Sequence, residues 1–238
     1  MPVDLLAIMA HPDDAELLCG GTLARAADQG HRTGVLDLTR GELGSRGTPE
    51  LRAREAADAA KVLGLAERVN AGLKDGHLVN DDAARRVVVE QLRRLRPRAV
   101  ILPYLTGRHP DHRIACELAR DACFLSGLKN YSADGERFRP GKICHALSFR
   151  EDAVKPTFVV DISAQFDRKL AAVMCFASQF EGVTQAGELH PTGQPLAELI
   201  ATQNAHYGSL IRSRYAEPFW TAETVSVDDI VAMTVSSM

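Results

Sequence analysis

The sequence lacks the usual features of a secreted or membrane-bound protein. Its five cysteines are scattered, and no Cys-x-x-Cys pair occurs, which argues against a disulfide scaffold and a zinc ribbon. No apolar run approaches the roughly 18 residues of a transmembrane helix, and the apolar N-terminus has no basic segment or cleavage site of a signal peptide. We therefore expect a cytoplasmic protein with reduced thiols and no membrane partner.

A strong charge of either sign is also missing. The 28 Lys and Arg residues nearly balance the 31 Asp and Glu residues, for a formal net charge of −3. No basic cluster of the kind that binds nucleic acid is present, so we expect no nucleic-acid partner. The hydrophobic share of 45% allows a sizeable core,. The length predicts one domain over residues 1–238, with a small C-terminal extension,.

Apolar runs alternate with segments of helical periodicity along most of the chain. The expected strands are residues 4–10, 33–39, 68–73, 98–102, 142–149 and 157–162. The expected helices are residues 14–29, 49–63, 80–96, 113–125, 164–179 and 196–212. This alternation predicts a Rossmann-like α/β fold, with a mostly parallel, doubly wound sheet and helices on both faces. Such sheets bind ligands beyond the carboxyl ends of the strands, where the strand order reverses.

Two histidine–aspartate clusters follow two of the expected strands. His-Pro-Asp-Asp occupies residues 11–14, and His-Pro-Asp-His occupies residues 109–112. If the strand order reverses between the strands at 4–10 and 98–102, the two clusters meet at one edge of the sheet. A catalytic zinc takes few protein ligands and leaves one position for water. Because spare acid–base residues accompany the candidate ligands, the pattern favours a reaction centre over a structural ion.

The candidate metal ligands are His11, Asp14 and His112. His11 and Asp14 are three residues apart at a strand–helix junction, and His112 begins the helix after the second cluster. Two imidazoles and one carboxylate suit Zn²⁺ or Fe²⁺. Zn²⁺ is the better choice for hydrolysis, because it lowers the pKa of bound water and polarises a carbonyl group. We therefore expect one Zn²⁺ per chain, with Fe²⁺ as the alternative.

The remaining residues of the two clusters are candidate acid–base groups. Asp13 is adjacent to a ligand and could take a proton from the attacking water. His109 could stabilise a tetrahedral oxyanion and later protonate a leaving amine. Asp111 has two interpretations that the sequence leaves open: it either orients His109 by accepting a ring N–H, or caps the helix that follows.

These clusters resemble the signature of the LmbE-like (PIG-L) zinc de-N-acetylase family, Ala-His-Pro-Asp-Asp followed by His-Pro-Asp-His. Further segments resemble the bacillithiol-biosynthesis deacetylases of that family: residues 41–48, 51–52, 55–56, 108–112, 156–163, 178–180 and 215–219. The resemblance covers nearly the whole chain. It implies a hydrolase that removes acetate from the glucosamine of N-acetylglucosaminyl-malate, a small amino-sugar substrate.

The resemblance also implies a role for individual residues. The family's zinc ligands, general base and oxyanion histidine fall on His11, Asp14, His112, Asp13 and His109, with Asp111 beside the last. Arg52 matches an arginine lining the substrate site, and Arg139 is a further candidate for binding the malyl carboxylates. Family members often place a tyrosine near the oxyanion. Residues 181–196 contain no tyrosine. Either His190 takes this role at the oxyanion, or no side chain from this stretch does. Members tend to form homo-oligomers through their C-terminal parts.

Three other functions stay open at this point. The same chemistry could act on a chitooligosaccharide, an antibiotic pseudoaglycone or a mycothiol precursor. A binding protein with a degenerate site is a second alternative, although it would need neither Asp13 nor His109. A phosphoesterase is a third, and it would favour a second metal ion and more carboxylates.

Overall fold

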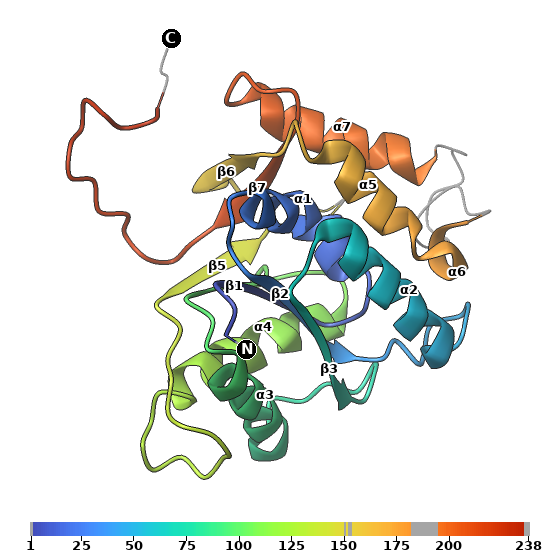
Figure 1. The fold of residues 1–238 in the computed structure, drawn as a ribbon, viewed down its shortest axis with the longest axis vertical. Coiled ribbons are helices and arrows are strands. Elements are labelled where there is room, and N and C mark those ends of the chain that lie inside the picture. Colours follow the sequence, from blue (N-terminus) through green and yellow to red (C-terminus); the bar gives the residue numbers. More distant parts are fainter. Residues whose placement is uncertain (1, 150, 152–153, 182–194, 236–238) are drawn as a thin grey trace.

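A seven-stranded sheet runs through the computed structural model, with helices on both faces (Figure 1). The structure describes residues 2–149, 151, 154–181 and 195–235. The strands are β1 (Leu5–Met9), β2 (Thr33–Thr39), β3 (Glu67–Leu73), β4 (Ala99–Pro103), β5 (Lys142–Ala146), β6 (Phe158–Asp161) and β7 (Ala216–Trp220). The helices are α1 (Asp14–Asp28), α2 (Pro49–Leu63), α3 (Asp82–Leu95), α4 (Pro110–Leu125), α5 (Phe166–Met174), α6 (Ala177–Phe180) and α7 (Leu196–Ser209). The predicted α/β fold is confirmed.

The strand order places β1 and β4 side by side within the sheet. The order is β3-β2-β1-β4-β5-β7-β6. The pairs from β3 to β5 are parallel, whereas β7 runs antiparallel to both of its neighbours. The chain moves outward from β1 to β3 and then returns to pair β4 with the free side of β1. The expected reversal of strand order therefore lies between β1 and β4, the strands that precede the two histidine clusters.

Helices cover the two faces of the sheet in separate groups (Figure 1). On one face α3 and α4 bury a core that includes Leu36, Val88 and Leu118. On the other face α1, α2 and α5 pack around Phe166 and Phe176. Among the described residues, no helix combines the length and the apolar character needed to cross a bilayer. A single sheet includes strands from residue 5 to residue 220. The assignment of residues 1–238 to one domain stays a prediction.

Local capping explains the boundaries of α2. The side chain of Thr48 accepts a hydrogen bond from the backbone N–H of Leu51, and Pro49 occupies the first helical position, where its missing N–H costs nothing. Gly64 ends the helix with a φ of 74°, a left-handed conformation that glycine adopts without steric cost. The helix over residues 49–63 was expected with these boundaries, because proline and glycine mark both of its ends.

Beyond shifts of a few residues at element ends, two elements differ from the sequence-based expectation. The helix expected over residues 164–179 divides into α5 and α6, because Phe176 leaves the helical path and is fully buried. Strand β7 was not expected. It is short and contains Glu217 and Pro218, residue types that are depleted in strands. Its place between β5 and β6 brings the C-terminal part of the chain into the sheet.

Candidate metal centre

The turn between β1 and α1 brings His11 and Asp14 together. Asp14 Oδ2 lies 3.3 Å from His11 Nδ1 and accepts a hydrogen bond from the backbone N–H of His11 at 2.9 Å. Asp13 occupies the N-cap position of α1, but its side chain makes no capping bond. The Asp14 carboxylate turns back toward the end of β1, so both side chains face one point.

Helix α4 brings the second cluster to the same point. The helix begins at Pro110, three residues earlier than expected, with His109 as its N-cap. His112 Nε2 lies 3.2 Å from Asp14 Oδ1. The ring of His11 is 4.7 Å from that of His109 and 5.4 Å from that of His112, measured between centroids. The two clusters therefore meet at the carboxyl edge of β1 and β4.

The donor atoms at this point fit a divalent metal ion. One nitrogen from each of His11, His109 and His112 can be chosen so that all lie within 4.8 Å of one another, and the Asp14 carboxylate faces two of these rings. Burial raises the pKa of Asp14, but His112 and His11 hold it well below its usual range. An ionised carboxylate between imidazoles is a donor set that zinc and ferrous iron both accept.

Asp13 stands beside these donors with an unusual backbone and a buried partner. Its φ of 114° lies in the left-handed region, which costs a non-glycine residue about 1–3 kcal/mol. The guanidinium of Arg52 donates from Nη2 to Asp13 Oδ2 at 2.8 Å and to the backbone carbonyl of Pro12. Burial raises the pKa of Asp13 to about 7, and Arg52 opposes that rise. A carboxylate with such a pKa suits general base catalysis near neutral pH.

Arg52 is therefore neither a solvated surface cation nor a freely exposed substrate ligand. Only 5% of the residue is exposed. Besides its contacts with Pro12 and Asp13, its Nη1 donates to the carbonyl of Gly41 at 3.2 Å. A side chain built at Gly41 would collide with this guanidinium, so the glycine allows Arg52 to reach the loop. The contact between Arg52 and a substrate stays a prediction.

Two carboxylates meet the other nitrogen of His11. Asp75 Oδ1 lies 3.0 Å and Asp111 Oδ2 lies 3.3 Å from His11 Nε2, and Asp111 also accepts from the backbone N–H of Gly76 at 2.7 Å. Asp111 thus orients His11, which corrects the expectation that its carboxylate orients His109 or caps α4. These three side chains form a second group of candidate donors. An Nε2–H held by carboxylates leaves Nδ1 free for a metal ion, as in many histidine sites.

Asp75 was missed by the sequence analysis. It lies two residues after β3, in Lys74-Asp75-Gly76, so it is a third acidic position at the carboxyl edge of the sheet. That placement was a usable signal. A lone Asp-Gly pair, however, is also typical of a turn, and although His77 follows it, the segment lacks the His-Pro-Asp pattern of the two clusters.

His109 faces the cleft with one nitrogen already engaged. Its Nδ1 accepts a hydrogen bond from the backbone N–H of Asp111 at 3.2 Å, which places the proton of the neutral ring on Nε2. Burial lowers the pKa of His109, and the neighbouring His11 and His112 lower it further. The neutral ring can donate one hydrogen bond from Nε2.

An open cleft of about 380 Å³ lies over these groups. It is lined by His11, Asp13, Leu43, Gly44, Arg52, Asp75, Gly76, His109, Pro110 and Gln179. The volume is that of a small-ligand site. The loop over residues 40–48 supplies one wall through Leu43 and Gly44.

Arg139 lies at the opposite end of α4 from the cleft. It donates from Nη2 to the carbonyl of Phe124 at 2.8 Å, and its guanidinium lies 4.4 Å from that aromatic ring. Phe124 is in the last turn of α4, whereas His112 is in the first, and a 16-residue helix is about 24 Å long,. The expectation that Arg139 binds substrate is therefore corrected. His190, considered as a substitute for a tyrosine, lies outside the described residues.

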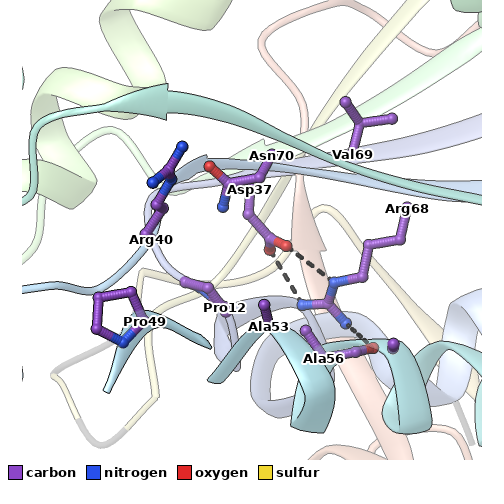
Figure 2. A pocket seen from close by; sticks show the side chains of 10 residues that line it. Pro12, Asp37, Arg40, Pro49, Ala53, Ala56, Arg68, Val69 and Asn70 are labelled. Carbon is purple, nitrogen blue, oxygen red and sulfur yellow. Dashed lines mark hydrogen bonds and ion pairs between the residues drawn. The ribbon is translucent and has the colours of Figure 1, made fainter. Parts of the chain in front are cut away.

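A second pocket lies between α2 and strands β2 and β3, with Pro12 in its wall. Figure 2 shows Arg68 on one side of this pocket, joined by dashed lines to Asp37, and Pro12 and Pro49 on the other. The two Arg68–Asp37 contacts are 2.8 and 3.1 Å long, and Arg68 Nη1 also binds Glu16. Glu16 is fully buried in the first turn of α1. Through Glu16, Arg68 therefore helps to hold the first turn of α1, which also carries Asp14.

Comparisons with known proteins agree with this geometry. A family model described as PIG-L, GlcNAc-PI de-N-acetylase, matches residues 6–123, a range that includes both histidine clusters. The diacetylchitobiose deacetylase of Thermococcus kodakarensis is 32% identical over 226 residues, which cover 90% of this chain and 80% of the relative.

Two further relatives extend the comparison. The crystal structure of the conserved protein TT1542 from Thermus thermophilus has a TM-score of 0.84 and 42% identity, and the match covers 95% of this chain and 98% of that one. The 4-oxalmesaconate hydratase of Pseudomonas putida is 27% identical over 73% of each protein, so the relatives include an enzyme of another reaction class. On this sequence and structural similarity, the chain belongs to the PIG-L (LmbE-like) deacetylase family.

Proposed function

We propose that this chain is a zinc-dependent N-deacetylase that hydrolyses the acetamide of N-acetylglucosaminyl-malate in bacillithiol biosynthesis. One observation carries the proposal: His11, Asp14 and His112 converge on one point, with Asp13 and His109 beside them, under an open cleft. Metal ligands, a base and a hydrogen-bond donor within one cleft are the parts that amide hydrolysis requires.

The roles of the residues follow from their positions. His11, Asp14 and His112 would hold the Zn²⁺, which when bound lowers the pKa of water and polarises the acetamide carbonyl. Asp13 takes the proton from the attacking water, and Arg52 holds the Asp13 carboxylate at the edge of the cleft. The Asp75–Asp111 pair keeps the proton of His11 on Nε2.

His109 supports the developing negative charge on the carbonyl oxygen. Its Nε2–H faces the cleft because Nδ1 is already an acceptor for the N–H of Asp111. A hydrogen bond that strengthens as charge develops lowers the barrier of acyl transfer. The leaving amine also needs a proton. His109 can pass one to it only as the protonated imidazolium, and the proton that Asp13 takes from the water is the one that balances this transfer.

The substrate assignment rests on the segments that resemble the bacillithiol enzymes, above all the loop over residues 40–48 and the helix that follows. The similarity to a diacetylchitobiose deacetylase supports the alternative, a chitooligosaccharide or another N-acetylglucosaminide. The cytoplasmic location and a homo-oligomeric state stay predictions.

Acetate release from N-acetylglucosaminyl-malate, diacetylchitobiose and free N-acetylglucosamine tests the proposal. We expect the malate conjugate to have the highest kcat/KM. Equal rates on the malate conjugate and the free sugar would contradict the substrate assignment but keep the chemistry. If none of the three sugars released acetate and the protein instead added water to an unsaturated carboxylate, a hydratase would replace the deacetylase as the proposed function.

A further inference from the structure

Helix α1 is broken one turn after the candidate metal ligand that it carries. Cys19 has φ −145° and ψ 17°, outside the helical region, in the middle of α1. Such a break leaves backbone groups without their helical partners. The segment before it, residues 14–18, is far too short to be stable as an isolated helix. Something outside α1 must therefore hold this segment and Asp14 in place.

A buried ion pair occupies the break. In a regular helix the N–H of Gly21 donates to the carbonyl of Leu17. Here the N–H of Gly21 donates to Glu217 Oε1 at 2.9 Å, and the carbonyl of Leu17 accepts from Lys169 Nζ at 2.8 Å. Lys169 Nζ and Glu217 Oε1 are 2.6 Å apart. The chain of contacts Leu17–Lys169–Glu217–Gly21 thus replaces one helical hydrogen bond.

The second oxygen of Glu217 completes this arrangement. Oε2 accepts from the backbone N–H of Thr22 at 2.7 Å and from its hydroxyl at 2.6 Å. A carboxylate therefore binds the N-terminus of the second half of α1, and an ammonium group binds the C-terminus of the first half. Both charges complement the helix dipole at the ends they meet. Lys169 is 1% exposed and Glu217 is fully buried.

We propose that Lys169 and Glu217 are positioning residues of the metal centre, acting on Asp13 and Asp14 through the break in α1. The proposal rests on the proposed function only for the identity of the metal ligands. Lys169 comes from α5 and Glu217 from β7, so the C-terminal part of the chain sets the orientation of the first turn of α1. A continuous helix would need neither side chain. Because α1 is broken, the position of its first turn depends on both Lys169 and Glu217.

Zinc affinity separates positioning from simple stabilisation. The variants are Lys169→Met and Glu217→Gln, and the matched control is Arg93→Met. Arg93 is nearly as buried as these residues and also binds backbone carbonyls, but those carbonyls belong to the segment after α4, away from the cleft. We expect each of the first two variants to bind zinc at least about tenfold more weakly, as measured by competition with a chelator. Arg93→Met should lose stability but keep the zinc Kd of the unmodified protein.

Hydrogen exchange of the metal-free protein provides a readout independent of zinc. Peptides covering residues 11–22 should exchange faster in Lys169→Met, whereas peptides from β4 and α4 should not change. If the unmodified protein binds no zinc, the proposed function fails, and this exchange pattern still decides the positioning role.

A neutral double variant covers the case in which the single variants do not fold. Lys169→Met combined with Glu217→Gln leaves no unpaired buried charge, so we expect it to fold. Because the carbonyl of Leu17 then lacks its donor, zinc binding should stay weaker than in Arg93→Met. Variants with unchanged zinc affinity and unchanged exchange at residues 11–22 would overturn the proposal.

Discussion

Arg52 and Arg93 are buried to the same extent in different parts of the molecule, yet they bind different partners. Each is 5% exposed. Arg52 binds a carboxylate, that of Asp13, together with the carbonyls of Pro12 and Gly41. Arg93 binds backbone carbonyls of the segment after α4, those of Ser126, Leu128, Tyr131, Ala133 and Gly135. Burial alone therefore does not separate a site arginine from a structural one. The group that each arginine binds, a site carboxylate or only backbone carbonyls, does separate them.

The largest expected effect comes from the partner of Arg52. Asp13→Asn keeps the shape of the side chain and tolerates a positive φ, but it removes the base. We expect kcat for acetate release to fall about 10²–10⁴-fold, with the zinc content unchanged. Activity assays and elemental analysis on the same preparation measure both quantities. Loss of zinc with retained turnover would place Asp13 among the groups that hold the metal and contradict its role as the base.

A smaller loss is expected from Arg52→Met. The guanidinium lowers the pKa of Asp13, so its removal raises that pKa. The base is then protonated over a wider range of acidic pH, and the acid limb of the pH profile of kcat should move to higher pH. We expect about a fivefold lower kcat near pH 7, since a rise of one unit from a pKa of about 7 lowers the ionised fraction at that pH from about one half to about one tenth,. An unmoved acid limb would show that Arg52 does not act through Asp13.

Arg93→Met is the opposite test, away from the cleft. Several buried carbonyls lose their donor at once, so the free energy of unfolding should fall by about 3 kcal/mol. Denaturant titration measures this loss. At a temperature where the variant stays folded, its kcat should equal that of the unmodified enzyme. A large drop in kcat would mean that the surroundings of the two arginines are coupled, and the contrast between them would fail.

The smallest effect is expected from Arg139→Ala. This guanidinium stacks on Phe124 and lies at the end of α4 away from the cleft. We expect KM for the malate conjugate to stay within about twofold, with a stability loss of about 1 kcal/mol from the lost cation–π contact. A KM that rises strongly for the malate conjugate alone would restore Arg139 as a substrate ligand and overturn its placement.

Local patterns were sufficient for most of the fold and for the site's composition. Proline and glycine marked both ends of α2, and the apolar runs before His11 and His109 were strands that proved to be neighbours. These features depend on contacts within a few residues, or on the general rule that ligands bind where the strand order reverses. Sequence periodicity can therefore reach them.

Contacts between distant segments were beyond the same reasoning. Asp75 meets His11 because the ends of β1 and β3 lie near each other across β2, and neither segment alone indicates the pair. Glu217 was hidden in a strand that contains proline, and its partners in α1 lie 196 and 195 residues away along the chain. Arg139 was a candidate because a guanidinium suits a carboxylate, whereas its location depends on the length of α4.

The strained backbone of Asp13 has a consequence for the natural history of this enzyme. Glycine adopts a positive φ without steric cost, and Asp13 has a φ of 114°. Asp13→Gly would relieve this strain, but it would leave the buried Arg52 guanidinium without its carboxylate partner, which costs about 3–5 kcal/mol and outweighs the strain. The ion pair therefore keeps a residue with a strained backbone at the position of the base. A descendant of this gene that loses Asp13 is expected to lose the charge of Arg52 as well.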